Sequence, residues 1–85
     1  MSANAYVLLN IDPVRTQEVI KRLHSVKGAL VREVIGPYDV ILELEGGTVE
    51  DITSTVRHKI RTIAGVAGTV TCMWVTEQAG HAAGG

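Results

Sequence analysis

The sequence predicts a single α+β domain, in which a four-stranded antiparallel sheet carries two helices on one face. Three observations lead to this prediction. The chain of 85 residues is long enough for only one domain. Short apolar runs suited to strands flank two segments with the periodicity of amphipathic helices. The order strand, helix, strand occurs once before and once after the central stretch Gly36–Asp39.

The first half of the chain reads as strand, helix, strand. The run Ala5–Ile11 is apolar on both faces, so both faces of this strand are expected to be covered. Asp12 can cap the helix Pro13–Ser25, because its carboxylate accepts from free N–H groups and proline suits the first helical position. Gly28 is the expected left-handed stop. The strand Ala29–Ile35 follows, and its interleaved charges indicate an edge strand.

The second half repeats the pattern. Val40–Glu45 alternates as a strand whose even-numbered residues point inward, and Thr48 with Asp51 forms a variant capping box. The helix is expected to reach Ile63, with Thr69–Thr76 as the last strand. Residues 77–85 contain too few apolar groups to offset the entropy of ordering and are expected to be disordered, as residues 1–4 are expected to be flexible. The folded domain is therefore predicted over residues 5–76.

Two such units joined by a tight turn form the ferredoxin-like βαββαβ fold. Within the turn, Gly36 can adopt positive φ, Pro37 fixes its own φ, and Asp39 can cap the turn. The sheet face without helices would expose Tyr6, Leu8, Ile41 and Trp74, together with Cys72 or Met73. A chain this small is marginal alone, and an exposed apolar patch normally marks an interface, so at least a homodimer is predicted.

Composition excludes several classes of protein. Eight basic and nine acidic residues give a formal charge of −1 without a basic run, so direct binding to nucleic acid is not expected. One cysteine excludes an intrachain disulfide and fits a reducing cytoplasm. The N-terminus suggests neither a signal peptide nor a membrane span. The histidines His24, His58 and His81 do not form a metal-ligand pattern. We therefore expect no metal, no cofactor and no catalytic residues.

Three stretches carry a family resemblance: the opening Ala5–Leu8, the central Gly-x-Tyr-Asp of Gly36–Asp39, and the closing Ile60–Val66 that leads to Thr69 and Thr71. They resemble the effector-binding (RAM) module of the leucine-responsive/asparagine-regulator (Lrp/AsnC) family, over residues 5–75. There is no room for a DNA-binding domain before Ala5, so the chain resembles a stand-alone form.

The resemblance implies a regulatory module that dimerises through its sheet, assembles further, and binds a small effector, typically an amino acid, between dimers. Full-length Lrp/AsnC regulators are further candidate partners. The implied ligand-binding residues are Gly36, Pro37, Tyr38, Asp39, Thr69 and Thr71.

The chemistry of these residues agrees with that role. Backbone N–H groups in a glycine-containing turn can hold a carboxylate, Asp39 can hold an ammonium group, and Thr69 and Thr71 can supply hydroxyl groups. The alternative is an ordinary hairpin turn with a capping aspartate. Two other functions share the element order: a small dimeric α+β barrel enzyme and an ACT-like amino-acid-binding domain.

Overall fold

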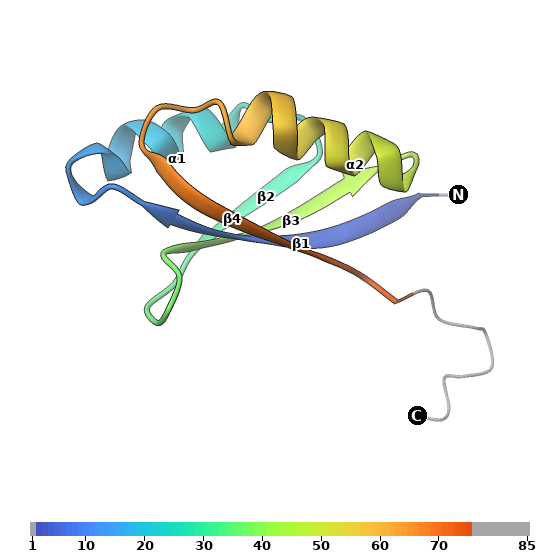
Figure 1. Cartoon of the computed structure of the whole chain (residues 1–85), viewed down its shortest axis with the longest axis horizontal. Coiled ribbons are helices and arrows are strands. Elements are labelled where there is room, and N and C mark those ends of the chain that lie inside the picture. Colours follow the sequence, from blue (N-terminus) through green and yellow to red (C-terminus); the bar gives the residue numbers. More distant parts are fainter. Residues whose placement is uncertain (1, 76–85) are drawn as a thin grey trace.

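The structure is a computed structural model that describes residues 2–75. Its elements are β1 (Ala3–Ile11), a 3₁₀ turn (Pro13–Arg15), α1 (Thr16–His24), β2 (Ala29–Glu33), β3 (Val40–Gly46), α2 (Val49–Thr55), a π-helical turn that continues α2 (Val56–Ile60), and β4 (Val66–Met73) (Figure 1). All neighbouring strands are antiparallel, in the order β2-β3-β1-β4. The predicted ferredoxin-like α+β fold is confirmed.

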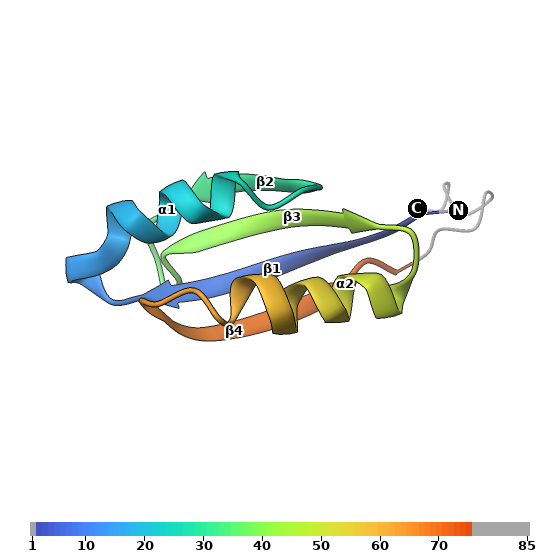
Figure 2. The same cartoon turned by 90° about the horizontal axis from the view of Figure 1, so that it is seen from above.

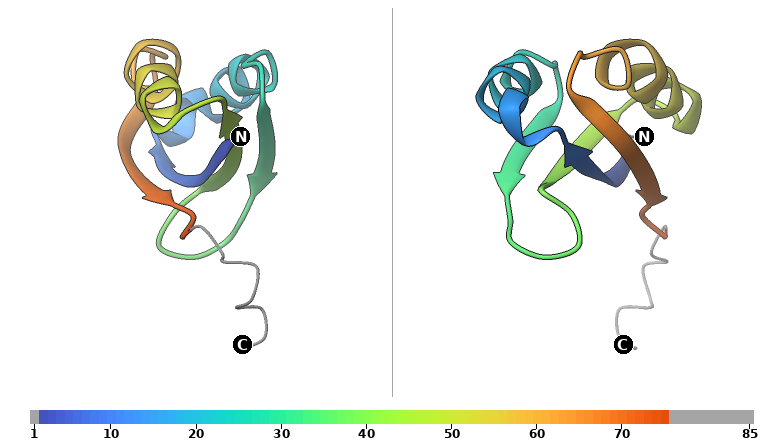
Figure 3. Two further views of the ribbon diagram at one scale, coloured as in Figure 1. Left: turned by 90° about the vertical axis from the view of Figure 1, so that its right-hand side faces the viewer. Right: turned by 60° about the vertical axis from the view of Figure 1, so that its left-hand side comes forward.

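Both helices lie on the same face of the sheet. Seen from above, α1 lies toward the β2 edge and α2 toward the β4 edge (Figure 2). The two views of Figure 3 show that no helix or strand of residues 2–75 covers the opposite face. We call the helix side the covered face and the opposite side the open face. The two central strands, β1 and β3, therefore have one face in the core and one face free.

The covered face forms an entirely aliphatic core. Strand residues such as Val7, Leu9 and Leu42 are 0% exposed and pack with Val19 and Leu23 of α1 and with apolar residues of α2. Burying each of these side chains contributes about 1.5–3 kcal/mol. None of the buried residues in the described part of the chain is polar or charged. The core therefore fixes which face of each strand points toward the helices.

Local signals begin and end the helices as predicted. Asp12 accepts a hydrogen bond from the Val14 N–H at 3.2 Å, and the capping box joins Thr48 and Asp51 in both directions, at 3.0 and 3.1 Å. Gly28 has φ +83°, and a Cβ there would lie 2.8 Å from the Glu45 carbonyl oxygen. Glycine is thus required after α1 both for its backbone angle and for the close approach of β3.

Several boundaries differ from the predictions. β1 begins at Ala3, because its ladder with β3 continues to the pair Ala3 and Gly46, so Ala3 and Asn4 belong to the sheet. β2 ends at Glu33, which leaves Ile35 outside the sheet. β4 begins at Val66, where pairing with Ile11 starts, and ends at Met73. Thr76 and the predicted tail, residues 77–85, lie outside the described residues.

The helices also differ in detail. α1 starts with a 3₁₀ turn and ends at His24, one residue early. α2 ends in a π-helical turn, in which the Arg61 N–H donates to the Val56 carbonyl at 2.8 Å. This bond spans five residues, which widens the last turn. The helix therefore stops at Ile60 and not at Ile63.

Candidate functional site

The predicted ligand-binding turn is a six-residue loop, Val34–Asp39, and not a tight hairpin turn. Glu33 and Val40 form the last pair between β2 and β3, so the residues between them must make the reversal. The Val34 N–H closes the loop by donating to the Asp39 carbonyl at 3.1 Å. Gly36 has φ +157°, a positive angle that residues with a side chain rarely adopt, although nothing lies within 4 Å of a Cβ built there. The predicted positive φ at Gly36 is therefore confirmed, although the reversal is longer than a tight turn.

Asp39 connects this loop to β1. Its Oδ2 accepts from the Ile11 N–H at 2.8 Å, while its own N–H donates to the Leu9 carbonyl at 2.9 Å. The carboxylate thus replaces a backbone carbonyl where β3 leaves the ladder. The sequence allowed Asp39 to cap its own turn, but its carboxylate instead accepts from Ile11 of β1. Its second oxygen, Oδ1, has no hydrogen-bond donor among residues 2–75, and the residue is exposed.

The loop projects on the side opposite the helices (Figure 3). At its tip Ile35 is 104% exposed, next to exposed Gly36 and Pro37, while Tyr38 is half-buried. Because this isoleucine is fully exposed, its side chain contributes no hydrophobic stabilisation to the single chain. The loop therefore presents an apolar tip beside the carboxylate of Asp39.

Thr69 and Thr71 lie elsewhere in the single chain. They pair with Leu9 and Val7, which places their side chains on the covered side of β4. β1 lies between β4 and β3, so Thr69 is two strand spacings, about 10 Å, from Val40 at the end of the loop. One copy of the chain therefore does not bring these threonines together with Asp39.

The four predicted interface residues all lie on the open face. Tyr6 and Leu8 of β1 and Ile41 of β3 alternate with core residues, and the rings of Tyr6 and Trp74 are 5.6 Å apart, tilted by 40°. Tyr6, Val70 and Trp74 remain 42–45% exposed. These predicted interface residues therefore give the open face apolar and aromatic side chains.

The register of β4 decides between two alternatives that the sequence left open. Cys72 pairs with Tyr6 and lies on the open face, whereas Met73 pairs with Ala5 on the covered face. Cys72 is a free, exposed thiol, and not a packed side chain in the single chain. Leu30, Val70, Arg32 and Glu43 also lie on the open face. The predicted interface did not include these four residues, although the strand period of two places them on this face once the register is known.

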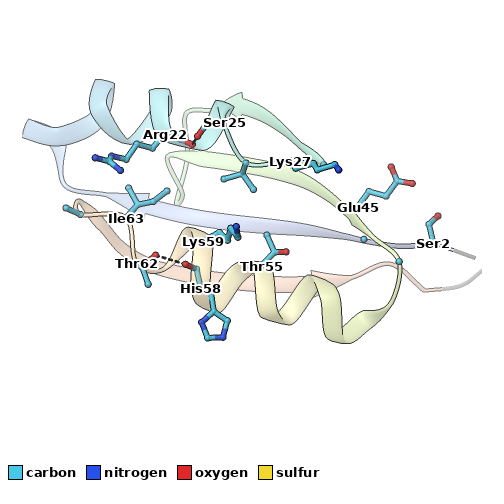
Figure 4. Close-up of a pocket in the computed structure, with 15 residues that line it drawn as sticks. Ser2, Arg22, Ser25, Lys27, Glu45, Thr55, His58, Lys59, Thr62 and Ile63 are labelled. Carbon is cyan, nitrogen blue, oxygen red and sulfur yellow. Dashed lines mark hydrogen bonds between the residues drawn. The ribbon is translucent and has the colours of Figure 1, made fainter.

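An open hollow of about 1090 Å³ lies on the other side of the molecule, between the end of α1 and the second half of α2. It carries Arg22, Lys27 and Lys59, but Figure 4 shows that Arg22 and Lys27 extend toward opposite ends and that His58 points away. Two hydroxyl groups of this hollow donate to backbone carbonyls: Ser25 to the Arg22 carbonyl at 2.7 Å, and Thr62 to the His58 carbonyl at 2.9 Å. The cations therefore do not converge on a common point.

Two further observations concern the part of the chain that the structure describes. His24 and His58 are exposed on different helices, and residues 2–75 contain no group of three or more histidine, cysteine, aspartate or glutamate side chains placed to hold a metal ion. No helix within these residues has the length and apolar character needed to cross a membrane. His81 lies outside the described residues.

Comparison with known proteins gives both a sequence relative and structural relatives. No protein-family model matches the chain. It is 31% identical over 75 residues to an uncharacterised HTH-type transcriptional regulator of Pyrococcus furiosus, a match that covers 84% of this chain and 50% of the relative. The chain thus spans about half the length of this curated relative.

Solved structures show the same fold. A Thermus thermophilus protein matches with a TM-score of 0.83 and 25% identity, covering 89% of this chain and 96% of that protein. Escherichia coli AsnC matches with a TM-score of 0.81 and 13% identity, over 88% of this chain and 52% of AsnC. At 13% identity, the second likeness shows the fold alone.

These findings define first a class. The chain is an α+β module whose sheet has one covered and one open face, and its sequence is similar to half of an HTH-type transcriptional regulator. The structural relatives, which include AsnC, agree with the resemblance of the sequence to the RAM module of the Lrp/AsnC family.

Proposed function

We propose that the chain is a non-catalytic regulatory module that dimerises through the open face and binds a small molecule of the amino-acid class between copies. The family supports a regulatory role. Dimerisation, the ligand and the ligand-binding residues are the proposed part. Full-length regulators of the same family are the further partners that this role suggests.

The observation that carries the proposal is the open face. Tyr6, Ile41 and Val70 place apolar side chains from three neighbouring strands on this face, and the ring of Trp74 lies beside that of Tyr6. Large exposed apolar patches are uncommon on monomers, and tyrosine and tryptophan are enriched at the centres of interfaces. A second copy placed on this face would remove these side chains from water.

The ligand-binding part rests on the loop. A site that binds an amino acid needs one group for the ammonium and another for the carboxylate. The free Oδ1 of Asp39 can accept a hydrogen bond from the ammonium. Because β1 separates Thr69 and Thr71 from the loop within one chain, their hydroxyl groups can complete such a site only from another copy. The proposed site therefore lies between copies, next to the apolar loop tip.

The first prediction concerns Asp39→Asn. The amide keeps an oxygen for the Ile11 N–H, so the free energy of unfolding should change by less than about 1 kcal/mol. The lost charge should weaken binding of an amino acid by about tenfold or more, because a charge-assisted hydrogen bond contributes about 1.5–3 kcal/mol. Thermal-shift screening of the amino acids selects the ligand, and calorimetric titration measures its affinity.

Asp51→Asn is the matched control. Asp51 also accepts one backbone N–H through Oδ2, at 3.1 Å, but it lies at the start of α2 and not in the loop. The control should bind the ligand with unchanged affinity. Equal affinities for the unmodified chain and Asp39→Asn would remove Asp39 from the site, and the absence of any thermal shift at millimolar amino acid would contradict ligand binding altogether.

A further inference from the structure

The free edge of β4 differs from an ordinary edge strand. β4 is one of the two outer strands, and its eight residues, Val66–Met73, include neither a charged residue nor a proline. The other edge, β2, is five residues long and carries Arg32 and Glu33. Natural sheets usually protect their edges by short strands, charges, prolines or bulges. The β2 edge has such protection along its length, whereas β4 has only the register shift between Val66 and Gly68 at its start, and residues 69–73 have none.

The backbone of β4 offers hydrogen bonds outward. The Trp74 N–H donates to the Asn4 carbonyl at 2.9 Å, which makes these two residues a hydrogen-bonded pair of the ladder with β1. Hydrogen-bonded and non-hydrogen-bonded pairs alternate in an antiparallel ladder. Thr69, Thr71 and Met73 therefore direct their N–H and C=O groups away from β1. Thr71 is exposed and Thr69 is half-buried, so this edge is accessible.

We propose that β4 pairs antiparallel with β4 of a second copy, so that two sheets join into one eight-stranded sheet. The arrangement places Val70 opposite Val70 of the second copy and Thr69 opposite its Thr71. Each Thr69–Thr71 pair then exchanges both outward backbone hydrogen bonds, in phase with the alternation set by β1. Threonine pairs across strands are favourable, and no like charges oppose each other.

The sequence of β4 favours a second β4 over other occupants. Pairing β4 with β2 of another copy would place Arg32 and Glu33 opposite uncharged residues, and this head-to-tail contact could continue into open chains. Pairing β4 with itself is two-fold symmetric and closes after two copies. It also keeps both pairs of helices on one side and extends the open face through Val70. The edge contact and the open-face contact of the proposed function use different surfaces.

Two substitutions at Thr71 test the edge by sedimentation. Thr71→Pro removes the outward N–H, and Thr71→Lys adds a charge without changing the backbone; both are tolerated at a free edge. We expect each to halve the mass of the assembly while circular dichroism stays unchanged. Glu33→Pro is the matched control, because Glu33 is also an exposed, outward-directed residue on an edge strand, and it should leave the mass unchanged. An unchanged mass for a folded Thr71→Lys would overturn the proposal.

Disulfide formation tests the register independently of any open-face contact, because Thr69 and Thr71 point to the covered side. Thr69→Cys and Thr71→Cys are each made with Cys72→Ser. Opposed Cα atoms of a hydrogen-bonded pair are about 5.5 Å apart, which suits a disulfide. In a glutathione redox buffer, an equimolar mixture of the two variants should form a covalent dimer, and neither variant alone should do so. Covalent dimer from one variant alone, or none from the mixture, would contradict this register.

The two proposals can fail separately. Tyr6→Ser combined with Trp74→Ser disrupts the open face and should leave the disulfide result unchanged. Failure of the mixture to cross-link, with the open-face dimer intact, would reject only the β4 pairing.

Discussion

The two faces of the sheet are built from the same strands but have opposite properties. On the covered face Val7, Leu9 and Leu42 are 0% exposed, whereas on the open face Tyr6 and Trp74 remain 42% and 45% exposed. Successive residues of a strand point to opposite faces, so each strand contributes to both. The side chains of the covered face are buried within one chain, and several of those on the open face are not.

The aromatic residues sharpen this difference. The chain has two tyrosines, one tryptophan and no phenylalanine. Tyr6 and Trp74 pack against each other on the open face, while every buried core residue in the described part of the chain is aliphatic. Aromatic side chains bury large areas and hold a polar group that can reach the rim of a contact. The core therefore forms without aromatics, and two of the three are left where a partner could cover them.

The largest expected effect tests the covered face. Leu42→Ala removes a fully buried side chain from β3 and leaves a cavity against the helices. It should lower the free energy of unfolding by about 2–5 kcal/mol, measured by urea denaturation. Ile41→Ala is the adjacent control on the open face, where the side chain is only half-buried, and should cost clearly less. If both substitutions lower the free energy of unfolding equally, the two faces contribute equally to the stability of the single chain.

A smaller effect is expected on the open face. Trp74→Ala should weaken self-association by about tenfold or more, equivalent to about 1.4 kcal/mol or more, with the secondary structure retained. Sedimentation over a range of concentrations measures the dissociation constant. Val49→Ala is the control, since Val49 is an apolar residue of α2 that is 52% exposed and lies away from the open face. If both variants associate as tightly as the unmodified chain, the open face is not the interface.

The smallest expected effect concerns Cys72. In the single chain its thiol is free and exposed on the open face. Burial of that face by a second copy should slow modification by a thiol reagent several-fold as the protein concentration rises through the dissociation constant, because only the dissociated form reacts readily. If the rate of thiol modification does not change with protein concentration although a dimer forms, Cys72 lies outside the contact.

Much of the fold could be predicted because its signals are local. Asp12 and the pair Thr48 and Asp51 cap helices as expected, and Gly28 ends the first helix with positive φ. The alternation of Val40, Leu42 and Leu44 correctly assigned the inner face of β3. Each of these signals acts over a few neighbouring residues, where caps, glycine conformations and hydrophobic periods operate. The sequence by itself thus determined the order of the elements and the faces of the central strands.

Tertiary structure decided the features that depend on distant residues. The register of β4 against β1 placed Cys72, and not Met73, on the open face. Asp39 bonds to Ile11, 28 residues away, where the sequence suggested a local cap. β1 separates Thr69 and Thr71 from the loop because the strand order is β2-β3-β1-β4. A local pattern cannot specify these relations, because register and strand order result from packing the whole sheet against both helices.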